Sequence, residues 1–252
     1  MTDLDRPEVP DRPERPEPRE HRDAGPYFVH AAPLDGADEA DDDAEAGARR
    51  PAPLSTVPAG HALPFDDPGW SFTGPGGTAL RDAAGLEVRA ECGADLFAMP
   101  GWYEADGVPL FGRTLTGDHM LWTDVTVRGR TFGDAGGIVV HGDDGWFKVC
   151  VERTRAGGWA VVTVVSRPLS DEAAGPALAG PRAELLVTRD GARHAVFCRE
   201  DPDEPWRFVR TFVGDAGPRV RVGLFAQAPF SEGCAAGFTS VRWAPVALAD
   251  RR

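Results

Sequence analysis

The alternate residues of the segment 146–152 are the best candidates for chemistry in this chain. Trp146, Lys148 and Glu152 supply an aromatic ring, a cation and a carboxylate, and in a β-strand they would all point to the same face. Lys148 is the only lysine of the protein. It would lie about 13 Å from Glu152, at ~3.3 Å per residue, so the two cannot form a direct ion pair. Each therefore needs a partner from another strand, or a ligand.

The neighbouring turns predict which residues share that face. Gly142–Gly145 is typical of a tight hairpin turn, and it would put Trp146 opposite His141. If Arg153 and Gly158 flank the next turn, Lys148 pairs with Thr163 and Glu152 with Trp159. A shift of one residue would reverse part of this face. The predicted surface consists of His141, Trp146, Lys148, Glu152, Trp159 and Thr163.

Two interpretations of this surface remain open. Tryptophan rings beside charged groups can form a sugar-binding platform, because an aromatic face packs on the apolar face of a pyranose while charged groups bind its hydroxyls. Alternatively, neighbouring strands satisfy the charges, which then only fix the register. On the opposite face, Phe147, Val149 and Val151 are expected to lie in the core.

An enzymatic function is left open, with no cofactor and no metal expected. A sandwich glycosidase needs two carboxylates about 5–10 Å apart, and no clustered Glu-x-Asp motif occurs on one strand. Glu152 could pair with Asp134 or Asp171 only if the fold brings them together. Nucleophile elbows, phosphate loops and His-Glu-x-x-His motifs are absent from the sequence.

The elements that must position these residues are short strands bounded by Gly, Pro or Asp, and no window of helical length keeps a 3.6-residue period. This pattern predicts an all-β fold, an antiparallel β-sandwich or jelly roll, over residues 61–248. The expected strands are 70–72, 86–92, 120–127, 138–141, 146–151, 159–165, 183–188, 194–198, 207–212, 220–226 and 236–243.

Residues 65–245 resemble domain-of-unknown-function family 1349, the concanavalin A-like domains whose fungal member is named for regulation of enolase. The most specific part of the resemblance is the Trp-x-Lys-x-x-x-Glu strand at 146–152. The resemblance implies a concanavalin A-like sandwich, and it supports the fold far more than the function because the family's chemistry is largely uncharacterised.

Further short motifs carry the same resemblance and add candidate ligand-binding residues. Asp95-Leu-Phe97 is similar to the family's Asp-Phe-Trp, and Gly117-Asp-His119 to its Gly-His turn. The chain departs from the family pattern at two positions. Gly133-Asp-Ala-Gly136 lacks the usual Gln, and Glu172 stands where the family favours Trp after Ser-Asp. The added candidates are Asp95, His119, Asp134, Ser170 and Asp171.

Residues 1–60 are expected to form a disordered, acidic and Pro-rich tail with a net charge of −8. The apolar island Pro26–His30 within it is a candidate docking motif for a protein partner. The overall charge of −13 argues against a nucleic-acid partner, and no apolar run is long enough to span a membrane. Four scattered cysteines and no visible export signal favour reduced thiols and a cytoplasmic location.

The sequence therefore predicts a domain that binds a carbohydrate-like or other small polar ligand on its concave sheet. A protein-interaction or regulatory domain of metabolism is the alternative. A sugar-active hydrolase with a non-standard carboxylate pair is the second alternative.

Overall fold

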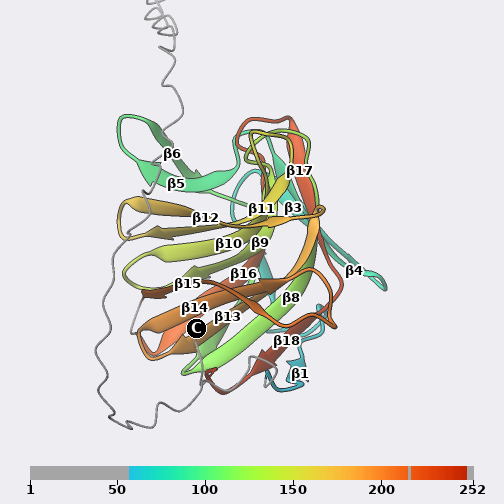
Figure 1. Cartoon of the computed structure of the whole chain (residues 1–252), viewed down its shortest axis with the longest axis vertical. Helices are drawn as coiled ribbons and strands as arrows, with labels where there is room; N and C mark the ends of the chain where they lie inside the picture. Colours follow the sequence, from blue (N-terminus) through green and yellow to red (C-terminus); the bar gives the residue numbers. More distant parts are fainter. Residues whose placement is uncertain (1–56, 215–216, 249–252) are drawn as a thin grey trace, which may run out of the picture. The chain divides into compact units, whose positions relative to one another are not determined.

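The computed structural model describes residues 57–214 and 217–248, and every regular element among them is a β-strand (Figure 1). The all-β prediction is therefore confirmed. The strands are β1 (His61–Ala62), β2 (Ser71–Thr73), β3 (Gly77–Asp82), β4 (Gly85–Glu91), β5 (Asp95–Met99), β6 (Tyr103–Gly107), β7 (Leu110–Thr116), β8 (His119–Arg128), β9 (Ala135–His141), β10 (Trp146–Arg153), β11 (Trp159–Ser166), β12 (Ser170–Leu178), β13 (Arg182–Asp190), β14 (Arg193–Arg199), β15 (Arg207–Val213), β16 (Arg219–Gln227), β17 (Gly233–Phe238) and β18 (Val241–Ala244).

Two large antiparallel sheets form the sandwich. The first has the order β15-β14-β13-β8-β17-β4-β3, with β18 beside β8 and β1 beside β18. The second has the order β12-β11-β10-β9-β16-β7-β2. A separate hairpin, β5-β6, lies next to β11 and β12 of the second sheet (Figure 1). Strand β10, the predicted site strand, is thus central in the second sheet.

The main core fills the space between the two large sheets. The alternation along β10 places Phe147, Val149 and Val151 in this core, as the sequence predicts. The ring of Phe147 contacts the ring of Phe212 edge-on, with 4.8 Å between centroids. The opposite side chains of β10 consequently face away from the main core.

That other face of the second sheet is covered by a second apolar layer. Leu96 and Phe97 of β5 pack against Val139, Val164 and Phe225 of the sheet. The face on which a ligand was expected is therefore closed over much of its area by the β5-β6 hairpin.

The register between β10 and β11 corrects the sequence prediction by one residue. Arg153 pairs with Trp159, so the loop Thr154–Gly158 has five residues. The amide of Thr154 donates to the Gly158 carbonyl at 3.0 Å, and the amide of Gly158 donates to the Thr154 hydroxyl at 3.0 Å. Gly157 has a φ of 79°, in the left-handed region that favours glycine. These contacts stabilise the longer loop and shift every cross-strand pair.

The strand list from the sequence omits six elements. These are β1, β3, β5, β6, β7 and β12, and the expected strand 236–243 is two strands, β17 and β18. Strand β6, Tyr-Glu-Ala-Asp-Gly, carries little apolar character, and β12 contains glycine and proline. Neither pattern satisfies the alternation rule by which the other strands were found.

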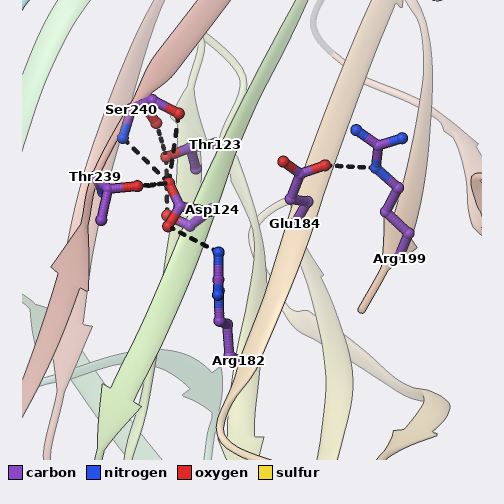
Figure 2. A network of polar contacts seen from close by, with 7 residues as sticks. All are labelled: Thr123, Asp124, Arg182, Glu184, Arg199, Thr239 and Ser240. Atoms are coloured by element: carbon purple, nitrogen blue, oxygen red, sulfur yellow. Dashed lines mark hydrogen bonds and ion pairs between the residues drawn. The ribbon is translucent and has the colours of Figure 1, made fainter. Parts of the chain in front are cut away.

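A buried carboxylate on β8 holds the corner between β17 and β18 (Figure 2). The Oδ1 atom of Asp124 accepts hydrogen bonds from the Thr239 hydroxyl at 2.7 Å and from the Ser240 amide at 3.1 Å. The Thr123 hydroxyl donates to the Ser240 carbonyl at 2.6 Å. Asp124 thereby lets the chain turn so that both short strands pair with β8.

Residues at the N-terminal end of the described part also contact the sandwich. Val57 packs against a cluster that includes Trp122 and Trp206, and Arg242 donates to the Ala59 carbonyl at 2.7 Å. The candidate docking motif Pro26–His30 lies outside the described residues. In the described residues we find no helix long and apolar enough to cross a membrane.

We expect Asp124→Ala to lower the free energy of unfolding by about 2–4 kcal/mol, because it leaves several donors of one corner without an acceptor. Asp124→Asn keeps an acceptor oxygen and should lose less. Urea unfolding of both variants measures this difference. Equal losses for the two would contradict the role of the hydrogen bonds, and Asp66→Ala, at an exposed position, is the control.

Candidate functional site

Lys148 is buried and is paired within the protein. Its Nζ atom donates to Oδ1 of Asp95 at 2.7 Å and to Oε1 of Gln227 at 2.8 Å. Only 2% of the Lys148 side chain and 6% of the Asp95 side chain are exposed. The charge of Lys148 is therefore satisfied within the protein, although not by β9 or β11, the strands that pair with β10. Its partners come from β5 and β16.

The hydrogen-bond network extends from this ion pair in both directions. The Tyr103 hydroxyl bonds to Asp95, and burial and this carboxylate together raise the pKa of Tyr103. At the other end, Nε2 of Gln227 donates to the Gly133 carbonyl at 2.8 Å. The network thus joins the β5-β6 hairpin, β10, β16 and the loop before β9.

Glu152 differs from Lys148 because it has no cationic partner at ion-pair distance in the described part of the chain. The residue is 9% exposed. Among the described residues its carboxylate has one hydrogen-bond contact, with the Cys150 thiol, whose Sγ lies 4.0 Å from Oε2. Burial raises the pKa of Glu152 to about 7, against the weaker opposing effect of Lys148. A buried carboxylate of this kind can exchange a proton near neutral pH.

Glu152 and Lys148 line a slot with a cavity volume of about 50 Å³ between the hairpin and the second sheet. Asp95, Gln227 and Glu172 complete its polar lining. Glu172 shares the cross-strand row of Lys148 and Val164 and is exposed. The apolar lining is mainly aromatic. Val164 and Pro229 contribute to it, and its five rings are those of Phe97, Trp102, Tyr103, Phe132 and Phe230.

The five rings form a continuous series of contacts. The Phe97 ring lies 6.0 Å from Trp102 and 5.9 Å from Tyr103, centroid to centroid. Tyr103 lies 5.5 Å from Phe230, which stacks on Phe132 at 5.9 Å. Trp102 is 67% exposed and Phe230 54% exposed. Aromatic surface at the mouth of the slot is therefore open to solvent.

Only some of the predicted site residues come together in this slot. Asp95, Lys148 and Glu152 line it, and Trp146 adjoins it with its ring centroid 6.0 Å from the Lys148 Nζ. His141 pairs with Trp146 as predicted. Burial and the nearby Arg221 lower the pKa of His141.

Trp159 and Thr163 do not share the face of Lys148. In the observed register Lys148 pairs with Val164 and Glu152 with Ala160, so the predicted pairs are wrong by one residue. Trp159 instead packs against the main core. The Thr163 hydroxyl donates to the Ala173 carbonyl at 3.4 Å.

The remaining candidates have contacts elsewhere. Oδ2 of Asp134 accepts from the Thr131 amide at 2.9 Å, while its Oδ1 accepts from the Ser231 hydroxyl at 2.6 Å. His119 is buried in the first sheet, where its Nδ1 lies 2.9 Å from the Gly117 carbonyl and burial lowers its pKa.

Ser170 and Asp171 lie at the start of β12 and serve two different contacts. The Ser170 hydroxyl accepts from the Ala98 amide at 2.9 Å and so ties the hairpin to the sheet. Asp171 pairs with Arg210 of β15 at 2.7 Å. The structure therefore pairs Glu152 with neither Asp134 nor Asp171, and Asp95 and Glu172 are the other carboxylates that line the slot.

The sequence pattern did not identify Gln227 or most of the aromatic wall. Gln227 ends a strand that was expected only as far as residue 226, and Tyr103 lies on the unexpected strand β6. Phe97 was noted only within the Asp-Leu-Phe motif. Glu172 could be noticed in the sequence only because it stands where the family favours Trp after Ser-Asp. The other missed residues are Trp102, Phe132 and Phe230.

The fold and the slot define a concanavalin A-like antiparallel β-sandwich with a hairpin over its second sheet. A family described as "Protein of unknown function (DUF1349)" matches residues 72–246, and the chain belongs to this family. No curated protein matches the sequence.

Solved structures of other proteins share the fold. A functionally unknown protein from Saccharomyces cerevisiae has a TM-score of 0.66 at 17% identity, covering 75% of this chain and all of its own. A xylan β-1,4-xylosidase from Bacillus halodurans has a TM-score of 0.50 at 14% identity; the match covers 62% of this chain but only 32% of that enzyme. An engineered GH43 glycoside hydrolase has a TM-score of 0.53 at 14% identity, with coverage of 84% and 43%. The match thus spans less than half of either enzyme.

We expect Lys148→Met to destabilise the fold by about 3–5 kcal/mol, because it leaves Asp95 as an uncompensated buried charge. The loss should be similar to that of Phe147→Ala, which removes core volume. Adding Asp95→Asn to Lys148→Met should restore part of the stability, whereas adding it to Phe147→Ala should not. Urea unfolding measures the stability of these four variants and of the wild type. A Lys148→Met protein as stable as the wild type would contradict the buried ion pair.

Glu152→Gln tests the raised pKa. The folded protein holds the Glu152 proton more tightly than the unfolded chain does, so stability present below the unfolded pKa of 4.5 is lost as the pH rises to about 7. Between about pH 5 and about pH 8 the wild type should lose roughly 2 kcal/mol relative to the variant. Parallel pH profiles for the two proteins would contradict this, and Glu91→Gln, at an exposed carboxylate, should follow the wild type.

Proposed function

We propose that the slot binds a small polar, carbohydrate-like ligand between the β5-β6 hairpin and the second sheet. The observation that carries this proposal is the combination of exposed aromatic rings at the mouth, Trp102 and Phe230, with a buried carboxylate, Glu152, inside. An aromatic ring packs on the apolar face of a sugar, and buried polar groups fix its orientation.

The size of the slot limits how such a ligand is bound. A volume of about 50 Å³ accommodates a few water molecules or one small polar group. A sugar ring would therefore lie across the mouth against Trp102 and direct one substituent into the slot. Ligands longer than a monosaccharide would extend over the exposed rim near Glu172.

The structural relatives agree with a sugar ligand without defining one. Two of them carry names of enzymes that act on glycosides. At 14% identity this likeness concerns the fold alone, and the proposal depends on the slot. A hydrolase would need a water and a scissile bond between two carboxylates. The slot is too small for that arrangement unless the hairpin moves, and binding without catalysis is the function we propose.

Screening a panel of monosaccharides by ligand-observed NMR tests the proposal, with the full chain and two variants. Trp102→Ala should weaken the binding of any ligand found by about tenfold, which is the loss of one aromatic contact worth roughly 1.4 kcal/mol. Because Trp102 is 67% exposed, its loss should leave the unfolding midpoint nearly unchanged.

Phe72→Ala is the matched control, because Phe72 is also an exposed aromatic residue, 41% accessible, on β2 and not part of the slot. It should bind the ligand as the wild type does. A ligand that binds Trp102→Ala and Phe72→Ala equally well would overturn the proposed site. A panel with no binder at all would overturn the proposed function.

A further inference from the structure

The slot is lined by more acidic groups than basic groups. Lys148 contributes one cation, and Asp95 already neutralises it at 2.7 Å. Glu152 and Glu172 then remain without a cationic partner in the described residues. Glu152 is the more significant of the two because it is 9% exposed. A buried carboxylate without a counter-ion favours a ligand that brings a positive charge.

The aromatic lining points to the same kind of ligand. The faces of aromatic rings carry negative potential and attract cations that lie within about 6 Å of the ring centroid. At the outer end of the series, Arg155 already places its guanidinium 4.1 Å from the Phe132 centroid. Phe132 lines the slot together with the rings of Phe97, Tyr103 and Phe230.

The volume matches an ammonium group better than a sugar ring. About 50 Å³ is sufficient for a group that replaces a few water molecules. We propose that the slot selects ligands that carry an ammonium group, such as an amino sugar or a small alkylamine. Glu152 is the counter-ion of that group, and Phe97, Tyr103 and Phe230 form its walls. This inference rests on the proposed function and specifies its ligand class.

This arrangement couples ligand binding to the ionisation of Glu152. The pKa of Glu152 is about 7 without a ligand, and a bound cation favours the ionised carboxylate. Binding of a cation should therefore release a proton from Glu152 and strengthen as the pH rises through 7. The other titratable groups around it are Asp95, Tyr103, Lys148, Cys150 and Glu172.

The single lysine gives a direct observable for this site. Because Lys148 is the only lysine of the chain, protein labelled with carbon-13 lysine shows one set of side-chain NMR signals, from within the slot. We would titrate the full chain with glucosamine and with glucose, and separately with propylammonium and with 1-propanol. Each pair is similar in size and differs chiefly in the charge.

We expect glucosamine and propylammonium to shift the Lys148 signals at concentrations about tenfold lower than glucose and 1-propanol do, as a charge–aromatic contact and an ion pair together allow. The affinity for propylammonium should rise between about pH 6 and about pH 8, because Glu152 ionises in that range. The affinity for 1-propanol should not change with pH.

Two variants distinguish the role of Glu152 as counter-ion from the general effect of removing one negative charge. Glu152→Gln should abolish the preference for the charged member of each pair. Glu91→Gln removes an exposed carboxylate elsewhere and should keep the preference. Equal preference in the two variants would overturn the role of Glu152.

The titrations also distinguish this inference from the proposed function. Equal affinity for glucosamine and glucose would overturn ammonium selection and leave sugar binding supported. Binding of propylammonium with no response to either sugar would support ammonium selection and overturn the sugar-like ligand. Unchanged Lys148 signals with all four compounds would overturn both.

Discussion

The buried ion pair between Lys148 and Asp95 is the constraint on which the architecture of the site depends. Two charges this far from water must stay paired, since separating them would expose each to a large desolvation penalty. Their contact at 2.7 Å joins the central strand β10 to the hairpin strand β5. Gln227 continues the network from Lys148 to β16 and to the Gly133 carbonyl. The position of the hairpin over the sheet follows from this network.

The hairpin also changes what the second sheet can offer to a ligand. One face of this sheet packs in the main core and the other packs on Leu96 and Phe97 of the hairpin. An open concave surface, as the sequence predicts, would give a ligand many strands to contact. The covered sheet leaves a narrow slot with Glu152 inside and Trp102 at the mouth. Recognition is thus limited to one small group and the aromatic surface beside it.

A single residue in a loop decided which side chains belong to the site. The five-residue loop Thr154–Gly158, with Gly157 at positive φ, pairs Arg153 with Trp159. Successive side chains of a strand point to opposite faces, so one extra loop residue moves a whole strand's set of side chains across the sheet. For that reason Trp159 and Thr163 face the main core side, whereas Val162 and Val164 share the face of Lys148. Loop composition alone does not specify this length.

The sequence by itself determined the all-β fold, the family and the core face of β10, because these follow from local alternation, turn residues and motif spacing. The tertiary structure alone decided what surrounds Lys148. Its partners Asp95 and Gln227 lie 53 and 79 residues away along the chain, and most of the aromatic wall comes from β6 and from loops that have no alternating pattern. Local turn residues predict the register across one tight hairpin, as for His141 and Trp146. Contacts between distant segments depend instead on the strand order of the whole sheet, which local residue patterns do not specify.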